Sequence, residues 1–128
     1  FPTRRSSDLV DDHLAVPFDD QPVAVGDLAD HGGLQVSFYA LKHATEGKKQ
    51  KKLLGFTPEQ RFFIAYAGVW GQNITEKEIR NRVKNDPHAL GKWRVDGALP
   101  HIDAWYEAFG VKQGDKLFIP KNQRLELW

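Results

Sequence analysis

The sequence predicts a mainly α-helical protein. Two segments carry helix-start signals, Thr57-Pro58-Glu59-Gln60 and Thr75-Glu76-Lys77-Glu78, in which a threonine caps the helix and a Gln or Glu follows three residues later. Behind the first start, apolar side chains recur at three- and four-residue spacing, as on one face of a helix. With 128 residues, of which 41% are hydrophobic, the chain can form one core but not two. We therefore expect one helical domain.

Four helices are expected in chain order. They cover residues 27–45, 57–70, 75–84 and 100–109. The first carries apolar side chains on nearly all faces, which predicts a buried helix, and its Gly32-Gly33 pair predicts a close approach by another backbone or a ligand. The second carries an aromatic stripe that we interpret as core, and Gly110 stops the fourth. The apolar run 117–120 near the carboxy terminus predicts a short extended segment.

The link between the third and fourth helices is expected to be irregular. Pro87 fixes its own φ and disfavours helical backbone at Asp86, so the third helix should end there and leave His88 on a turn. Further on, Lys92-Trp93-Arg94-Val95 alternates polar and apolar residues, which predicts a short extended stretch with Arg94 on the same side as Lys92. Asp86, His88 and Arg94 combine an acid, an imidazole and a guanidinium, a set able to grip a polarised peptide carbonyl. From the residues alone, a solvated surface turn is the simpler interpretation.

The first 25 residues are not expected to belong to the fold. Residues 1–9 resemble translated sequencing-adapter read-through, and residues 10–25 combine acidic pairs with two prolines and show no helical period. The chain contains no methionine, so we expect a fragment of a longer natural protein. The folded part is therefore predicted to comprise residues 26–128.

Charge and composition argue against several classes of protein. The net charge is +1 with 27% charged residues, so no general attraction to nucleic acid or anionic lipid is expected. No run approaches the roughly 20 apolar residues of a membrane-spanning helix, so no membrane segment is expected. The absence of cysteine excludes disulfides and thiolate metal ligands. The lysine-rich segment 48–52 is the basis of a nucleic-acid-binding alternative.

Three blocks, in order along the chain, resemble the neprilysin-like zinc metalloendopeptidases, the family that includes neprilysin, the endothelin-converting enzymes and bacterial oligopeptidase O. The first block, Ala29-Asp30 with Gly32-Gly33-Leu34, resembles the second zinc-site helix of that family. The second is Asp86-Pro87-His88 with Arg94, and the third is the terminal Leu125-Glu126-Leu127-Trp128. The resemblance runs from Gly26 to Trp128 and implies the carboxy-terminal helical portion of a zincin-type catalytic domain.

The resemblance implies a role for each candidate site residue. Asp30 would be the carboxylate that hydrogen-bonds a zinc-bound histidine, and His88 would donate, as a neutral imidazole, to the oxyanion of the tetrahedral intermediate. Arg94 would bind a backbone carbonyl of the substrate, and Asp86 would orient His88. The implied cofactor is Zn2+ and the implied substrates are oligopeptides. The implied location is extracytoplasmic, whether periplasmic, secreted or membrane-anchored.

The zinc-ligand positions depart from the family pattern. The family has a Glu four residues before the position of Asp30, where this chain has Gly26, and Asp27 can replace that metal ligand only if one residue has been lost. None of the five histidines begins the His-Glu-x-x-His segment, which supplies two ligands and the general base in that family. A three-ligand catalytic zinc cannot be built from these residues. We therefore expect the chain alone to be inactive, with the missing amino-terminal part of its own catalytic domain as its partner.

Three functions stay open at this point. The first is a fragment of a zinc-dependent metalloendopeptidase that hydrolyses oligopeptides. The second is a non-catalytic peptide-binding module that keeps Arg94 as a carbonyl clamp and has lost the metal. The third is a nucleic-acid-binding helical domain centred on residues 48–52. His31 and His43 are interpreted as ordinary helix histidines that cap, pack or face solvent.

Overall fold

The computed structural model describes residues 25–127, with side chains described from Leu28 onward. The expected leader, residues 1–25, lies outside the described residues except for Val25, and Trp128 also lies outside them. The fold is mainly α-helical, which confirms the predicted class. Its elements are α1 (Val25–Thr45), α2 (Pro58–Val69), α3 (Glu76–Asn85), α4 (Gly91–Ala98), the 3-10 helix η3 (Leu99–His101), α5 (Asp103–Phe109) and the 3-10 helix η4 (Lys121–Gln123). Within residues 25–127 no strand forms, and residues 118–120 are irregular backbone that leads into η4.

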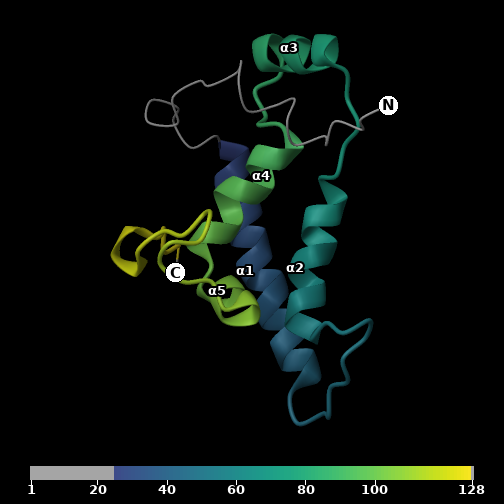
Figure 1. The fold of residues 1–128 in the computed structure, drawn as a ribbon, viewed down its shortest axis with the longest axis vertical. Coiled ribbons are helices and arrows are strands. Elements are labelled where there is room, and N and C mark those ends of the chain that lie inside the picture. The colour runs from purple at the N-terminus through teal and green to yellow at the C-terminus, as the bar shows by residue number, and fades with distance from the viewer. Residues whose placement is uncertain (1–24, 128) are drawn as a thin grey trace.

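The helix α1 is the longest element, and the others are arranged around it. α1 and α2 run antiparallel as a long hairpin, and α3 lies beyond one end of that hairpin (Figure 1). α4 packs against α1, whereas α5 packs against α2. Because η3 joins α4 directly to α5, the second half of the chain bridges the two long helices.

The hydrophobic core lies where these helices meet. The buried cluster contains Leu34, Phe63, Ala98, Leu99 and Ile102. Phe63 is 1% exposed, and the ring of Phe38 stacks on it with 5.3 Å between the centroids. Burial of a side chain of this size contributes about 1.5–3 kcal/mol. The aromatic stripe of α2 is therefore core at Phe63, although Val69 at its end is 72% exposed.

The first predicted helix cap is confirmed and the second forms only in part. Thr57 Oγ1 accepts from the amide of Gln60, and Gln60 Oε1 accepts from the amide of Thr57, at 3.2 and 3.0 Å. Thr75 Oγ1 accepts from the amide of Glu78 at 3.3 Å, which starts α3. The Glu78 carboxylate instead accepts from Arg82 Nε at 2.9 Å, so the reciprocal half of this capping box is replaced by an i,i+4 ion pair.

The expected extended stretch at residues 92–95 is wrong, because residues 91–98 form α4. Leu90 has extended backbone before the helix, and its carbonyl accepts from the amide of Arg94 at 3.1 Å. An alternation over only four residues does not distinguish a strand from one turn of helix. Lys92 and Arg94 consequently have different surroundings. Lys92 pairs with Asp96 in solvent at 2.6 Å, whereas Arg94 is largely buried.

The last expected helix begins later than predicted. Pro100 lies within η3 rather than at the start of an α-helix. Ile102 then has extended backbone, with φ −106° and ψ 108°, so α5 begins only at Asp103. The predicted stop is correct, since Gly110 has φ 66° and caps the helix in the left-handed conformation.

The expectation that α1 is buried on nearly all faces is also wrong within the described residues. His31 and Leu34 are buried, whereas Val36 and Tyr39 are 57% and 62% exposed. A Cβ added at Gly33 would meet no described atom within 4 Å, so the predicted close approach is not made there. α1 thus has one face in the core and one face open to solvent.

Gly91 allows α4 to start directly against the end of α2. A Cβ added there would lie 2.4 Å from the Trp70 carbonyl oxygen, whereas one added at Gly97, in the same helix, would meet nothing within 4 Å. We expect Gly91→Ala to lower the free energy of unfolding by about 1–3 kcal/mol. We expect Gly97→Ala to leave it unchanged or raise it by up to about 1 kcal/mol. Urea unfolding of both variants tests this, and equal effects would contradict the contact.

Candidate functional site

Asp30 and Arg94, two of the predicted site residues, form an ion pair between α1 and α4. Arg94 Nε donates to Asp30 Oδ2 at 2.6 Å, across 64 positions in the sequence. Each side chain is only 16% exposed, so water screens the pair weakly. Removing one partner of such a pair leaves the other as a largely buried charge, which is costly. The pair therefore fixes both the packing of α4 on α1 and the position of the guanidinium.

Trp70 forms a third side of this arrangement, a role that its sequence position alone does not indicate. Arg94 Cζ lies 4.0 Å from the centroid of the Trp70 ring, a cation–π geometry. Tyr66, one helical turn earlier on α2, donates its hydroxyl to the Arg94 carbonyl oxygen at 3.1 Å. The aromatic spacing of α2 indicates a core, but it does not show which ring contacts a charged group.

Asp86 and His88 form a second pair on the turn between α3 and α4. Asp86 Oδ1 lies 2.8 Å from His88 Nδ1 and accepts from the His88 amide at 2.9 Å. Hydrogen bonds from that amide and then from the imidazole lower the pKa of Asp86. Its carboxylate is therefore ionised above pH 4, and the contribution of this pair is lost as the pH falls through the lowered pKa. Both side chains are substantially exposed.

This contact determines which nitrogen of His88 carries a proton. An ionised carboxylate only accepts hydrogen bonds, so Nδ1 must donate to Asp86. In a neutral imidazole the proton is then on Nδ1, and Nε2 is an acceptor. Donation from Nε2 requires the doubly protonated imidazolium. The expected role of His88 as a neutral donor from Nε2 stays a prediction, and it requires the ring to leave this contact with Asp86.

The two pairs come from adjacent parts of the chain. His88 lies three residues before the first residue of α4, and Arg94 lies in the first turn of that helix. Asp86 and His88 contact each other, whereas Arg94 contacts Asp30 in α1 and Trp70 at the end of α2. The guanidinium of Arg94 is thus held in the junction of α1, α4 and the end of α2, whereas the imidazole of His88 is exposed on the turn before α4.

The described residues do not fit a zinc site on their own. Gly26 and Asp27 lie in the first turn of α1, and Asp27, the candidate metal ligand, has no described side chain. Elsewhere in the described part of the chain, no three His, Cys, Asp or Glu side chains are grouped so that they could hold a metal ion. A catalytic zinc needs three protein ligands.

Comparisons with known proteins find relatives that match most of this chain. The model of Peptidase family M13 matches residues 5–125 of this chain. It is 36% identical over 104 residues to human membrane metallo-endopeptidase-like 1, covering 79% of this chain and 13% of that protein. It is 32% identical over 93 residues to the endothelin-converting enzyme homolog of Locusta migratoria, covering 70% and 13%. The chain therefore spans about an eighth of the length of these relatives.

A solved structure also resembles this fold. The zinc metalloprotease Zmp1 of Mycobacterium tuberculosis, in complex with an inhibitor, is 30% identical, with a TM-score of 0.75. The match covers 80% of this chain and 16% of that one. The same protein in an open state gives a TM-score of 0.76 over the same shares. The helical arrangement described above thus resembles one segment of that larger metalloprotease.

The Asp30–Arg94 pair can be tested against an exposed pair on the same helix. We expect Asp30→Asn to lower the free energy of unfolding by about 2–4 kcal/mol, because it leaves the guanidinium largely buried without its counter-charge. Asp96→Asn breaks the exposed Lys92–Asp96 pair and should cost under about 1 kcal/mol. Chemical denaturation of both variants measures the difference. Similar small losses in the two would show that the buried pair does not hold the junction.

Proposed function

Because this chain belongs to peptidase family M13, we propose that it supplies part of the active site of a zinc-dependent endopeptidase that hydrolyses oligopeptides. The observation that carries this proposal is the guanidinium of Arg94, fixed between the Asp30 carboxylate and the Trp70 ring. The similarity to a zinc metalloprotease over most of this chain supports it.

Arg94 is the proposed clamp for a backbone carbonyl of the substrate. A guanidinium carries five N–H donors in one plane, so it can hold Asp30 and a carbonyl oxygen together. The ion pair and the stacking on Trp70 remove most of its rotational freedom before substrate binds. Binding then costs less side-chain entropy, and the carbonyl is held at one position.

Asp30 is the proposed link between this clamp and the metal site. One of its carboxylate oxygens is engaged by Arg94. A carboxylate offers about four acceptor positions, so the group can also orient an imidazole that binds the metal. A single residue of α1 would thereby set the distance between the metal and the substrate backbone.

His88 is the proposed donor to the oxygen of the scissile carbonyl as negative charge develops there. In the imidazolium form its Nε2 donates while Nδ1 remains held by Asp86. Removal of such a donor typically costs about 3 kcal/mol of transition-state stabilisation. Asp86 orients the ring through its contact with Nδ1.

The rest of the catalytic domain is the proposed partner of this chain, and it would bring Zn2+ with most of its ligands. Asp27, beside Gly26 at the family's glutamate position, is the candidate ligand within this chain. The open face of α1, with Gly33 and the exposed Val36 and Tyr39, is where that domain would pack. Similarity to membrane metallo-endopeptidase-like 1 supports an extracytoplasmic location for the whole protein. Within residues 25–127 no helix has the length and hydropathy to cross a membrane.

A non-catalytic peptide-binding protein is the second candidate. Gly26 at the position of the family's ligand favours it, because glycine has no side chain to bind a metal. Such a protein would keep the clamp at Arg94 and bind peptides without cleaving them. Full-length protein that binds peptide but no zinc would distinguish this function from that of an active enzyme.

The 128-residue chain alone is expected to be inactive. Purified chain incubated with a fluorogenic oligopeptide and added zinc should show no cleavage above the buffer rate, because the required ligands are incomplete. The full-length protein that contains this chain serves as the positive control. Cleavage by the chain alone that depends on zinc and stops with a chelator would overturn this prediction.

The proposed roles of His88 and Arg94 predict different kinetic effects in the full-length protein. His88→Gln should lower kcat by about 10²–10³-fold with a small change in KM, because its interaction forms mainly in the transition state. Arg94→Lys should raise KM, because ammonium lacks the planar donor fork. Lys92→Gln, on the solvent side of α4, is the control and should change neither constant by more than about twofold. Equal effects in all three would contradict the assignment.

A further inference from the structure

His31 is a buried polar side chain that the proposed active site does not use. It is 1% exposed, on the core face of α1. Among the described residues, neither of its ring nitrogens has a hydrogen-bond partner. Burial lowers the pKa of His31 below its ordinary value, so the imidazole is neutral near pH 7. His31 does pack in the core, which was one of the expectations from the sequence, but the sequence did not indicate that a second histidine lies beside it.

That neighbour is His101, in η3. The two ring centroids are 6.0 Å apart. His101 Nδ1 accepts a hydrogen bond from the amide of Leu125 at 3.0 Å. A backbone amide can only donate, so Nδ1 carries no proton while this bond exists. The bond therefore requires His101 to be neutral.

The carboxy-terminal segment, residues 119–127, has other attachments that do not titrate near neutral pH. Arg124 Nη1 donates to Asp103 Oδ1 at 2.6 Å, and its guanidinium lies 3.4 Å from the centroid of the Tyr106 ring. The Ile119 amide donates to the Tyr106 hydroxyl at 3.0 Å. Hydrogen bonds from Lys121 and then Arg124 lower the pKa of Asp103, so this carboxylate stays charged in mild acid. The contact with Leu125 is the one that depends on a histidine.

We propose that His31 and His101 form a pH-sensitive latch that holds the carboxy-terminal segment at Leu125. A proton added at His101 Nδ1 turns the acceptor into a donor, and two N–H groups then face each other. The hydrogen bond breaks, and the positive imidazolium then lies beside the buried ring of His31. The segment around Leu125 separates from η3, while Arg124 keeps the preceding residues attached.

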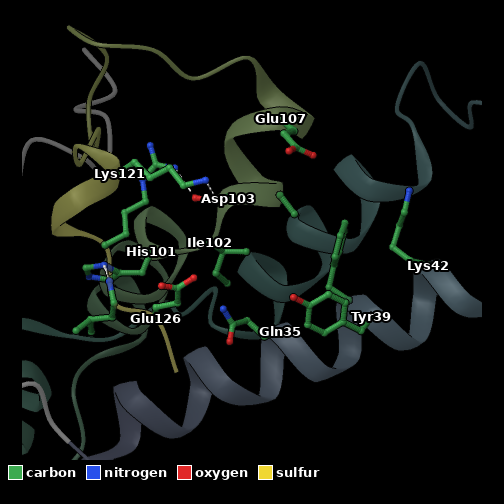
Figure 2. A pocket seen from close by; sticks show the side chains of 13 residues that line it. Gln35, Tyr39, Lys42, His101, Ile102, Asp103, Glu107, Lys121 and Glu126 are labelled. Atoms are coloured by element: carbon green, nitrogen blue, oxygen red, sulfur yellow. Dashed lines mark hydrogen bonds and ion pairs between the residues drawn. The ribbon is translucent and has the colours of Figure 1, made fainter. Parts of the chain in front are cut away.

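The surroundings of the pair place the transition below the ordinary imidazole pKa of 6.5. Burial, then His31, then Arg124 lower the pKa of His101. Asp103 from α5 and Glu126 from the carboxy-terminal segment line the same hollow of about 490 Å³ as His101 (Figure 2). Asp103 is already engaged by Arg124 and Lys121. Asp30, the chain neighbour of His31, is engaged by Arg94, and no acid raises the pKa of His101 against the effect of burial.

The sign of the effect on stability follows from these shifts. Both histidines have a lower pKa in the fold than the ordinary value of 6.5. As the pH falls through 6.5, the unfolded chain takes up protons that the folded pair resists. The folded state is therefore fully stabilised above pH 6.5 and loses stability as the pH falls below it.

Amide exchange and imidazole titration by NMR on the 128-residue chain test the latch. Between pH 7.5 and 5, the Leu125 amide should lose protection about five- to tenfold after correction for intrinsic exchange, as expected for one hydrogen bond. The midpoint should lie below 6.5 and coincide with the titration of the His101 ring. His101→Gln should abolish this pH dependence. His43→Gln, at an exposed histidine of α1, should preserve it.

His31→Leu tests the coupling between the two rings. Without the second imidazole, the His101 titration should move upward towards 6.5 and the loss of Leu125 protection should follow it. An unchanged His101 midpoint would remove His31 from the latch. Leu125 protection that is constant between pH 7.5 and 5, or that falls equally in His101→Gln, would overturn the latch itself. Neither result bears on the proposed peptidase function.

Discussion

The ion pair between Asp30 and Arg94 is the constraint on which the described fold depends. It joins α1 to α4 across 64 positions, and each side chain is 16% exposed. Because an unpaired charge is costly to bury, each charge is stabilised by the other, and α4 has one preferred position on α1. The Trp70 ring closes the third side of the guanidinium. Three helices therefore meet at a charged group, which gives the junction a more specific geometry than apolar contact alone would.

The backbone around this pair is adapted to it. α4 starts against the carbonyl of Trp70, and only a residue without a Cβ fits at Gly91. Because α4 begins so close to Trp70, its first turn places Arg94 against the Trp70 ring. Upstream, Pro87 ends α3 and leaves Asp86 to accept from both the amide and the ring of His88. The turn and the helix start together place an exposed imidazole six residues before a largely buried guanidinium.

Local signals in the sequence predicted the start of α2 and the end of α5, whereas tertiary contacts decided where α4 forms and how the helices pack. Thr57 and Gly110 act on neighbouring backbone atoms, so a few residues of sequence are enough to predict their effects. α4 was missed because its short alternation fits a strand or a helix, and the contact at Gly91 is visible only in three dimensions. The resemblance identified Arg94, but no pattern indicated that Trp70 would be the ring beneath it. The nearly complete burial of His31 could not be predicted either, because helical spacing does not show which helices pack over a residue.

The two faces of α1 suggest a reason for Gly33, whose cost in helix stability no contact within the described residues offsets. Gly33 in a helix interior costs about 1 kcal/mol relative to alanine. Within the described residues nothing approaches it, while exposed Val36 and Tyr39 lie on the open side of the same helix. A glycine that weakens a helix and touches nothing is accounted for if another element packs there in the whole protein, since close helix packing needs small residues. The same helix presents His31 and Leu34 to the core described here. α1 is thus suited to be a central helix, and Asp30 lies near the boundary between its two faces, where it reaches Arg94 and, in the proposed function, would also orient a metal-bound imidazole.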